Sequence, residues 1–145
     1  MIRLAAAFAL GMSALALSAC TATGEAPGEA ANQWVTVSGK IAYRERIALP
    51  PTAQIEVKLD DVSLADAPSK TIARQAFGAD GQQVPIAFLL RFDRSAIDAK
   101  HSYAVSARIT GDDGKLMFIT DTRNSVTFDG ASEVDLGVLN LVKTH

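Results

Sequence analysis

The segment Ile55-Glu-Val-Lys-Leu-Asp60 alternates strictly between apolar and charged side chains, and this alternation decides the fold class. In an extended chain successive side chains point to opposite faces, so the apolar positions share one face and the charged positions share the other. This is the pattern of a half-buried β-strand. The same alternation recurs in residues 35–43 and 103–109. No long segment after residue 33 shows the helical spacing of apolar residues three or four positions apart.

Further strands are predicted at residues 70–77, 84–92, 116–120 and 134–142. Segment 70–77 alternates poorly, and Ala73-Arg-Gln-Ala76 would also suit a helix. Strand is favoured there because Gly78-Ala-Asp-Gly81 resembles a hairpin turn. Asp112-Asp-Gly114 predicts a second hairpin. About seven short strands with frequent turns predict an all-β sandwich.

The N-terminus has the pattern of a secretory signal peptide over residues 1–19. Arg3 opens an apolar run, Leu4 to Leu17, and small residues precede Cys20, the single cysteine. Leu17-Ser-Ala-Cys20 resembles a bacterial lipobox, which implies that Cys20 takes a diacylglyceryl group and becomes the mature N-terminus. A transmembrane helix is the alternative, but it needs about 20 apolar residues. We therefore expect the lipid on Cys20 to be the contact with the membrane.

Residues 20–33 are predicted to form a lipidated flexible tether, because they are rich in Gly, Pro, Ala and Glu. Residues 34–145 are then long enough for one folded domain. Thr21, rather than an aspartate, follows the cysteine. By resemblance to lipoproteins of Gram-negative bacteria, this implies export to the outer membrane, with the domain facing the periplasm.

Charge and cysteine content exclude several classes of function. The chain has a net charge of −2, and loss of the one positive charge of Arg3 with the signal peptide brings this to −3. Binding to nucleic acid requires clustered cations that neutralise phosphates, so no nucleic acid partner is expected. Lipidation would use the only thiol, which leaves no cysteine for a disulfide or for thiolate chemistry.

Five segments of the domain are similar, in order, to the YbaY family of bacterial lipoproteins, with which the YscW type of secretion pilotin is grouped. They are Ser38–Arg46, Leu49–Pro51, Val57–Pro68, Gly81–Ile86 and Phe118–Thr122. The resemblance implies a small immunoglobulin-like or transthyretin-like β-sandwich. The pilotin members are lipoproteins that help a secretin ring reach the outer membrane, so an envelope protein such as a secretion component is the partner that the resemblance implies.

No catalytic residue, metal site or cofactor is predicted. His101 and His145 have no carboxylate or second histidine at metal-ligand spacing, and His101 is interpreted as a solvent-exposed loop residue. The aspartates at 60–61, 66 and 112–113 lack the spacing of a calcium loop and are interpreted as turn residues. Tyr103 resembles a tyrosine corner, whose phenol would bond back to the connection before it.

Surplus apolar residues are the one feature that a plain sandwich does not explain. In residues 84–92 and 116–120 both faces are apolar, although one face of each strand should meet water. One explanation is that loops such as 63–70 cover the second face. Otherwise Leu89, Met117 and Ile119 form an exposed patch that marks a binding partner.

The sequence thus predicts a non-enzymatic, lipid-anchored envelope lipoprotein with a binding, chaperone or assembly role. The alternative is a carbohydrate-active or hydrolytic accessory protein of the envelope, which would need a cleft of convergent polar groups. A flat apolar patch over the second face of the two apolar strands would favour the first interpretation. Two carboxylates that face each other across a pocket would favour the second.

Overall fold

The computed structural model describes residues 33–145, so the predicted signal peptide, Cys20 and nearly all of the tether lie outside the described residues. Eight strands follow one another, and a short 3₁₀ helix, η1 (Arg94–Ala96), lies between the fourth and the fifth. No α-helix occurs in this part of the chain, which confirms the all-β prediction. The strands are β1 (Trp34–Tyr43), β2 (Gln54–Asp61), β3 (Lys70–Gly78), β4 (Ile86–Asp93), β5 (Tyr103–Thr110), β6 (Leu116–Ile119), β7 (Asn124–Val126) and β8 (Glu133–Lys143).

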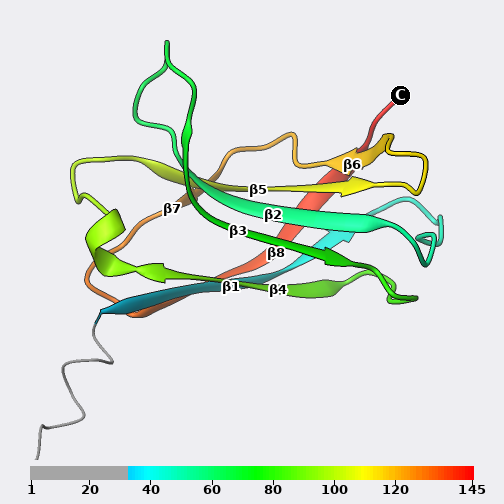
Figure 1. Cartoon of the computed structure of the whole chain (residues 1–145), viewed down its shortest axis with the longest axis horizontal. Helices are drawn as coiled ribbons and strands as arrows, with labels where there is room; N and C mark the ends of the chain where they lie inside the picture. The colour runs from blue at the N-terminus through cyan, green and yellow to red at the C-terminus, as the bar shows by residue number, and fades with distance from the viewer. Residues whose placement is uncertain (1–32) are drawn as a thin grey trace, which may run out of the picture.

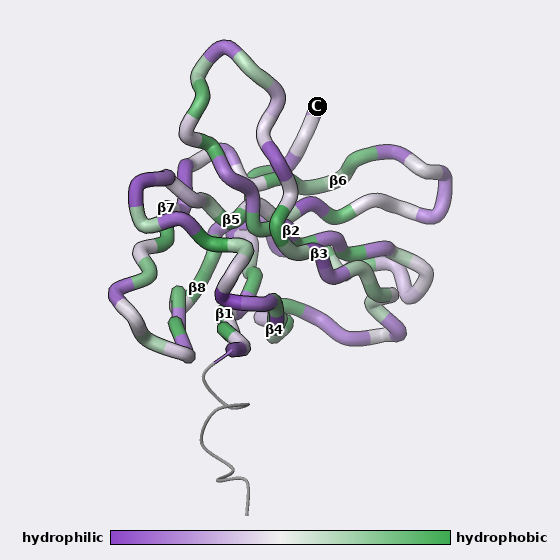
Figure 2. The backbone as a smooth tube through the Cα atoms, turned by 60° about the vertical axis from the view of Figure 1, so that its left-hand side comes forward, coloured by the Kyte–Doolittle hydropathy of each residue, from purple (hydrophilic) through white to green (hydrophobic). Residues whose placement is uncertain are grey.

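The strands form one rolled sheet in the order β3-β2-β5-β6-β8-β1-β4, with β7 paired to β5 (Figure 1). All pairs are antiparallel except β1 with β8. Pairing of β6 with β8 joins the strands β3-β2-β5-β6 to the strands β8-β1-β4. The domain therefore does not have the two separate sheets of the predicted sandwich. Figure 2 shows β2, β3 and β5 above β1 and β4. Buried residues from both groups of strands form the core.

The core consists of the apolar positions that alternate along the strands. Ile55, Val57 and Leu59 of β2 are fully buried, and Val37 and Ile41 of β1 lie in the same cluster. In β4 every second residue from Ile86 to Phe92 is buried and the residues between them are exposed. The second apolar face of β4 is therefore not covered by a loop.

Gly39 occupies an inward position of β1, where it makes room for an aromatic ring. A Cβ atom at Gly39 would lie 2.8 Å from Cζ of Phe88, its partner on β4. The absent side chain thus allows the buried Phe88 ring to fill the core at this point. On the other side of β1, the register with β8 shifts between Ser38 and Lys40, and Gly137 of β8 has a φ of 68°. Glycine adopts this left-handed conformation without steric cost.

Of the two predicted hairpins, one is confirmed and one is wrong. Residues 112–114 connect the paired strands β5 and β6, and Gly114 has the positive φ that such a turn favours. A turn also exists at residues 78–81, but β3 and β4 do not pair after it. The turn is bound to the β1–β2 connection instead, because Ala79 N donates to Ala53 O at 2.8 Å and Asp80 N donates to Pro51 O. β4 then leaves to pair with β1.

The sheet is nearly closed, because its two edge strands, β3 and β4, come close to each other. One side chain bridges this seam: Leu89 N of β4 donates to Gln75 Oε1 of β3 at 2.8 Å. Gln75 is opposite the buried Val57 and is half-buried itself, so its amide points toward the core side of β3. A side chain therefore supplies the acceptor that a paired strand would otherwise provide.

Candidate functional site

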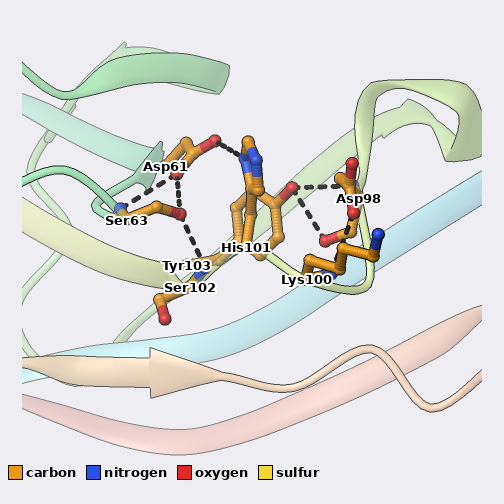
Figure 3. A network of polar contacts seen from close by, with 7 residues as sticks. All are labelled: Asp61, Ser63, Asp98, Lys100, His101, Ser102 and Tyr103. Carbon is orange, nitrogen blue, oxygen red and sulfur yellow. Dashed lines mark hydrogen bonds and ion pairs between the residues drawn. The ribbon is translucent and has the colours of Figure 1, made fainter.

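A polar cluster of Asp61, Ser63, His101 and Ser102 joins the end of β2 to the connection before β5 (Figure 3). The Asp61 carboxylate contacts His101 Nδ1 through Oδ2 at 2.6 Å. Its other oxygen accepts from Ser63 Oγ at 2.6 Å and from Ser63 N at 3.0 Å. Ser63 Oγ in turn accepts from Ser102 N at 2.9 Å. The cluster therefore holds the start of the β2–β3 loop against the segment that leads into β5.

These hydrogen bonds favour the ionised form of Asp61. The hydroxyl of Ser63, then the ring of His101 and the amide of Ser63, lower the pKa of the Asp61 carboxyl to about 2, from an ordinary value of 3.8. The carboxylate is thus charged at neutral pH and remains an acceptor for all three donors.

Tyr103 lies beside this cluster and forms the predicted corner. Asp98 N donates to Tyr103 Oη at 2.8 Å, and the phenol donates to Asp98 O at 3.3 Å. The ring is buried and meets Phe128 edge-on, with ring centroids 5.6 Å apart. The bond back to the preceding connection confirms the tyrosine corner, and it fixes the segment that carries His101.

The cluster contains an acid–histidine pair but not the arrangement of a hydrolase. A nucleophile must be hydrogen-bonded to its base, with a third group orienting that base. Here the Ser63 hydroxyl donates to the Asp61 carboxylate and accepts from Ser102 N, so it is engaged away from the His101 ring. Within residues 33–145 no group of three or more His, Cys, Asp or Glu side chains could hold a metal ion. The arrangement is suited to holding two loops together.

Sequence reasoning missed the Asp61–His101 pair. Its two residues are 40 positions apart, and the prediction of a solvent-exposed loop histidine was only partly right. The His101 side chain is 46% exposed, but it has a specific carboxylate partner. The clean alternation of β2 places Asp61 at a strand end, yet no local pattern in the sequence indicates which loop that end meets.

The structure separates the three residues predicted to form an apolar patch. Leu89 is 52% exposed on β4, whereas Met117 and Ile119 are half-buried on β6, three strands away along the sheet. The register of β5 with β6 shifts at Ile109/Thr110, which leaves Met117 in a bulge. Met117 packs against the core, while Ile119 lies opposite the exposed Arg108. The period of two that grouped Met117 with Ile119 is thus interrupted by the bulge.

Two shallow apolar regions remain on the surface. One is a groove of about 560 Å³ on the outer side of β4, β1 and β8, between the exposed side chains of Leu89 and Val138. The other, of about 370 Å³, lies at the β6 end of the domain, where the exposed Ile47 and Leu116 flank Met117. In residues 33–145 no helix has the length and hydropathy that a membrane span requires.

The described domain is thus all-β, with polar contacts that lock two connections together and shallow apolar grooves on its surface. The sequence model of the type III secretion system lipoprotein chaperones (YscW) matches residues 32–138, and the chain belongs to this family. The uncharacterized lipoprotein YbaY of Escherichia coli (strain K12) is 39% identical, over 90% of this chain and 76% of the relative. The predicted family resemblance is therefore confirmed.

A solved structure agrees with this assignment. An alternative pilotin from the type II secretion system of Vibrio cholerae superposes with a TM-score of 0.70 and is 48% identical to this chain. The match covers 78% of this chain and 99% of the pilotin chain.

Proposed function

We propose that this chain is a lipid-anchored lipoprotein of the outer membrane that faces the periplasm and assists the assembly of an envelope protein, as a pilotin does. The observation that carries the proposal is the match to the Vibrio cholerae pilotin along 99% of its length, at 48% identity. A secretion component of the envelope is accordingly the class of partner that we infer.

The proposed anchor is a lipid on Cys20, exposed by removal of residues 1–19. Support comes from the lipobox-like Leu17-Ser-Ala-Cys20 and from membership of a lipoprotein family. A single acyl chain gives only marginal membrane binding, so a diacylglyceryl group is needed for stable attachment. Residues 20–33 then connect this anchor to the domain at 34–145.

We infer that the role is binding rather than catalysis. In the polar cluster the Asp61 carboxylate and the Ser63 hydroxyl are both engaged in internal hydrogen bonds, which favours a structural role for these two groups. The proposed partner contact is the β6 end of the domain, where Met117 lies with the exposed Ile47 and Leu116. Ile119, two residues further along β6, extends this contact into the neighbouring depression that Arg108 and Thr120 also line. Exposed apolar residues that gather in one place commonly mark a protein contact.

Site-specific crosslinking in intact cells tests this proposal. A photoreactive amino acid is placed at Ile119 and, as a matched control, at Leu64, which is 72% exposed on the β2–β3 loop. We expect position 119 to crosslink to an outer-membrane secretion component and position 64 not to do so. Equal products from both positions, or no envelope protein from position 119, would contradict the proposed contact.

A further inference from the structure

The outer side of β4, β1 and β8 collects exposed apolar and aromatic side chains. We define this β4–β1–β8 face by Trp34, Leu89 and Val138, which are 43%, 52% and 51% exposed. Their neighbours on the same side are Lys40, opposite Val138, and Arg91, whose guanidinium lies 4.7 Å from the centroid of the Trp34 ring. The groove between Leu89 and Val138 continues this surface.

The described chain begins at one edge of this face. Trp34 is the first residue of β1, and the thirteen residues 21–33 separate it from Cys20. A flexible chain of that length spans about 20 Å on average. In Figure 1, β1 and β4 lie at the bottom of the domain, and the β2–β3 loop protrudes at the top. A lipid on Cys20 therefore holds the β4–β1–β8 face nearer to the bilayer than any surface on the β2–β3 side.

The residue types of this face suit the interface between lipid and water. Tryptophan has an apolar ring and an N–H donor, and it is enriched at the headgroup level of membranes. Lys40 and Arg91 can extend their charged ends to phosphates while their stems lie along the apolar surface. Asp135 also lines the groove and the exposed Asp93 lies opposite Trp34, so two carboxylates offset the two cations and the contact does not depend on anionic lipid.

We propose that the β4–β1–β8 face rests on the surface of the bilayer to which the chain is anchored. This inference rests on the proposed lipid attachment at Cys20. Attachment by a short flexible linker gives an effective concentration of about 1 mM, so a surface with a dissociation constant of only about 1 mM is half occupied. Such contact orients the domain: the Asp61–His101 cluster and the β2–β3 loop, on the opposite side, face the periplasm.

Fluorescence quenching by brominated lipid tests the proposal, because Trp34 is the only tryptophan of the chain. The full lipidated protein is placed in vesicles of phosphatidylethanolamine and phosphatidylglycerol, with or without bromine on the acyl chains. Bromine quenches by contact, so a domain that tumbles on its tether keeps its emission. If the indole lies at the headgroup level, we expect about twofold quenching. The quenching should persist in high salt, because the face carries balanced charge.

Two variants separate contact from attachment. Leu89→Glu combined with Val138→Glu should abolish the quenching, whereas Leu64→Glu on the β2–β3 loop should leave it unchanged. Flotation of the same vesicles reports lipid attachment independently. Wild-type protein that floats without being quenched would overturn the inference, leave the anchor intact and assign this face to a protein partner. Protein that does not float would overturn both the anchor and the orientation that rests on it.

Discussion

Gln75 Oε1 accepts a hydrogen bond from Leu89 N at 2.8 Å, across the seam between β3 and β4, the two end strands of the sheet order. Backbone groups alternate in direction along an antiparallel strand, so the Leu89 amide points away from β1 and would be a free edge donor without this bond. An unprotected strand edge invites pairing with another chain. The Gln75 side chain therefore protects one edge amide of β4 from pairing with another chain, although β3 and β4 themselves stay unpaired.

Replacing the acceptor should loosen the seam. We predict that Gln75→Leu lowers the free energy of unfolding by about 1 kcal/mol, the net value of one hydrogen bond. The Leu89 amide should also exchange with solvent faster, which amide hydrogen exchange can measure. Gln75→Glu keeps an acceptor oxygen in place and serves as the control. Equal protection of Leu89 in both variants would show that the side chain does not hold the seam.

Tyr103 should contribute through its hydroxyl as well as its ring. We predict that Tyr103→Phe lowers the free energy of unfolding by about 1–3 kcal/mol, because Asp98 N loses its acceptor in a partly buried position. Urea denaturation of the protein gives this value directly. A denaturation midpoint equal to that of the wild type would argue that the corner does not stabilise the fold.

The polar cluster predicts a specific response to acid. The pKa of the Asp61 carboxyl is about 2 in the folded chain, below its ordinary value of 3.8. The folded state therefore gains stability from Asp61 above a pH of about 4, and this gain is lost as the pH falls toward about 2. Asp61→Asn should flatten the decline of the unfolding midpoint over that range.

Ser63→Ala provides the control for this response, because the Ser63 hydroxyl is the largest cause of the low pKa of Asp61. In that variant an NMR titration should show the Asp61 carboxyl titrating closer to 3.8. If the Asp61 titration is the same in Ser63→Ala and wild-type protein, the hydrogen bond does not set the pKa.

The bulge in β6 predicts different costs for one substitution at two nearby positions. Met117 packs against the core, whereas Ile119 is half-buried opposite the exposed Arg108. We predict that Met117→Lys lowers the unfolding free energy by about 2–3 kcal/mol, while Ile119→Lys costs about 1 kcal/mol or less. Thermal denaturation of the two variants tests this. A larger loss for Ile119→Lys would mean that this residue is core and leaves no partner contact there.

Much of the fold is predictable from the sequence because strand alternation is a local property. The pattern of β2 placed Ile55, Val57 and Leu59 in the core correctly, and the poorly alternating segment 70–77 is indeed a strand. β7 was missed because three residues, Asn124–Val126, are too few to show a period. The pairing of β6 with β8, which makes one sheet of all the strands, depends on contacts between distant parts of the chain. No local pattern in the sequence indicates such contacts.

The candidate site was less predictable than the fold. The role of Tyr103 was predictable because its hydroxyl bonds to Asp98, only five residues earlier in the sequence. His101 and Asp61 meet through two loops that lie far apart in the sequence, so their pairing required the tertiary structure. Leu89 is exposed, as only the second of the two alternatives for the apolar faces required, but the bulge at Met117 and the strand order separate it from β6.

The assembly role is tested most directly by the amount of secretin multimer in the outer-membrane fraction of the source bacterium. The measurement compares cells with the wild-type chain, cells that lack it, and cells that carry only Cys20→Ala, which keeps the folded domain but removes the proposed anchor. We predict that the multimer decreases in the outer membrane without the chain and that Cys20→Ala does not restore it. Equal amounts of outer-membrane multimer in all three strains would contradict the account.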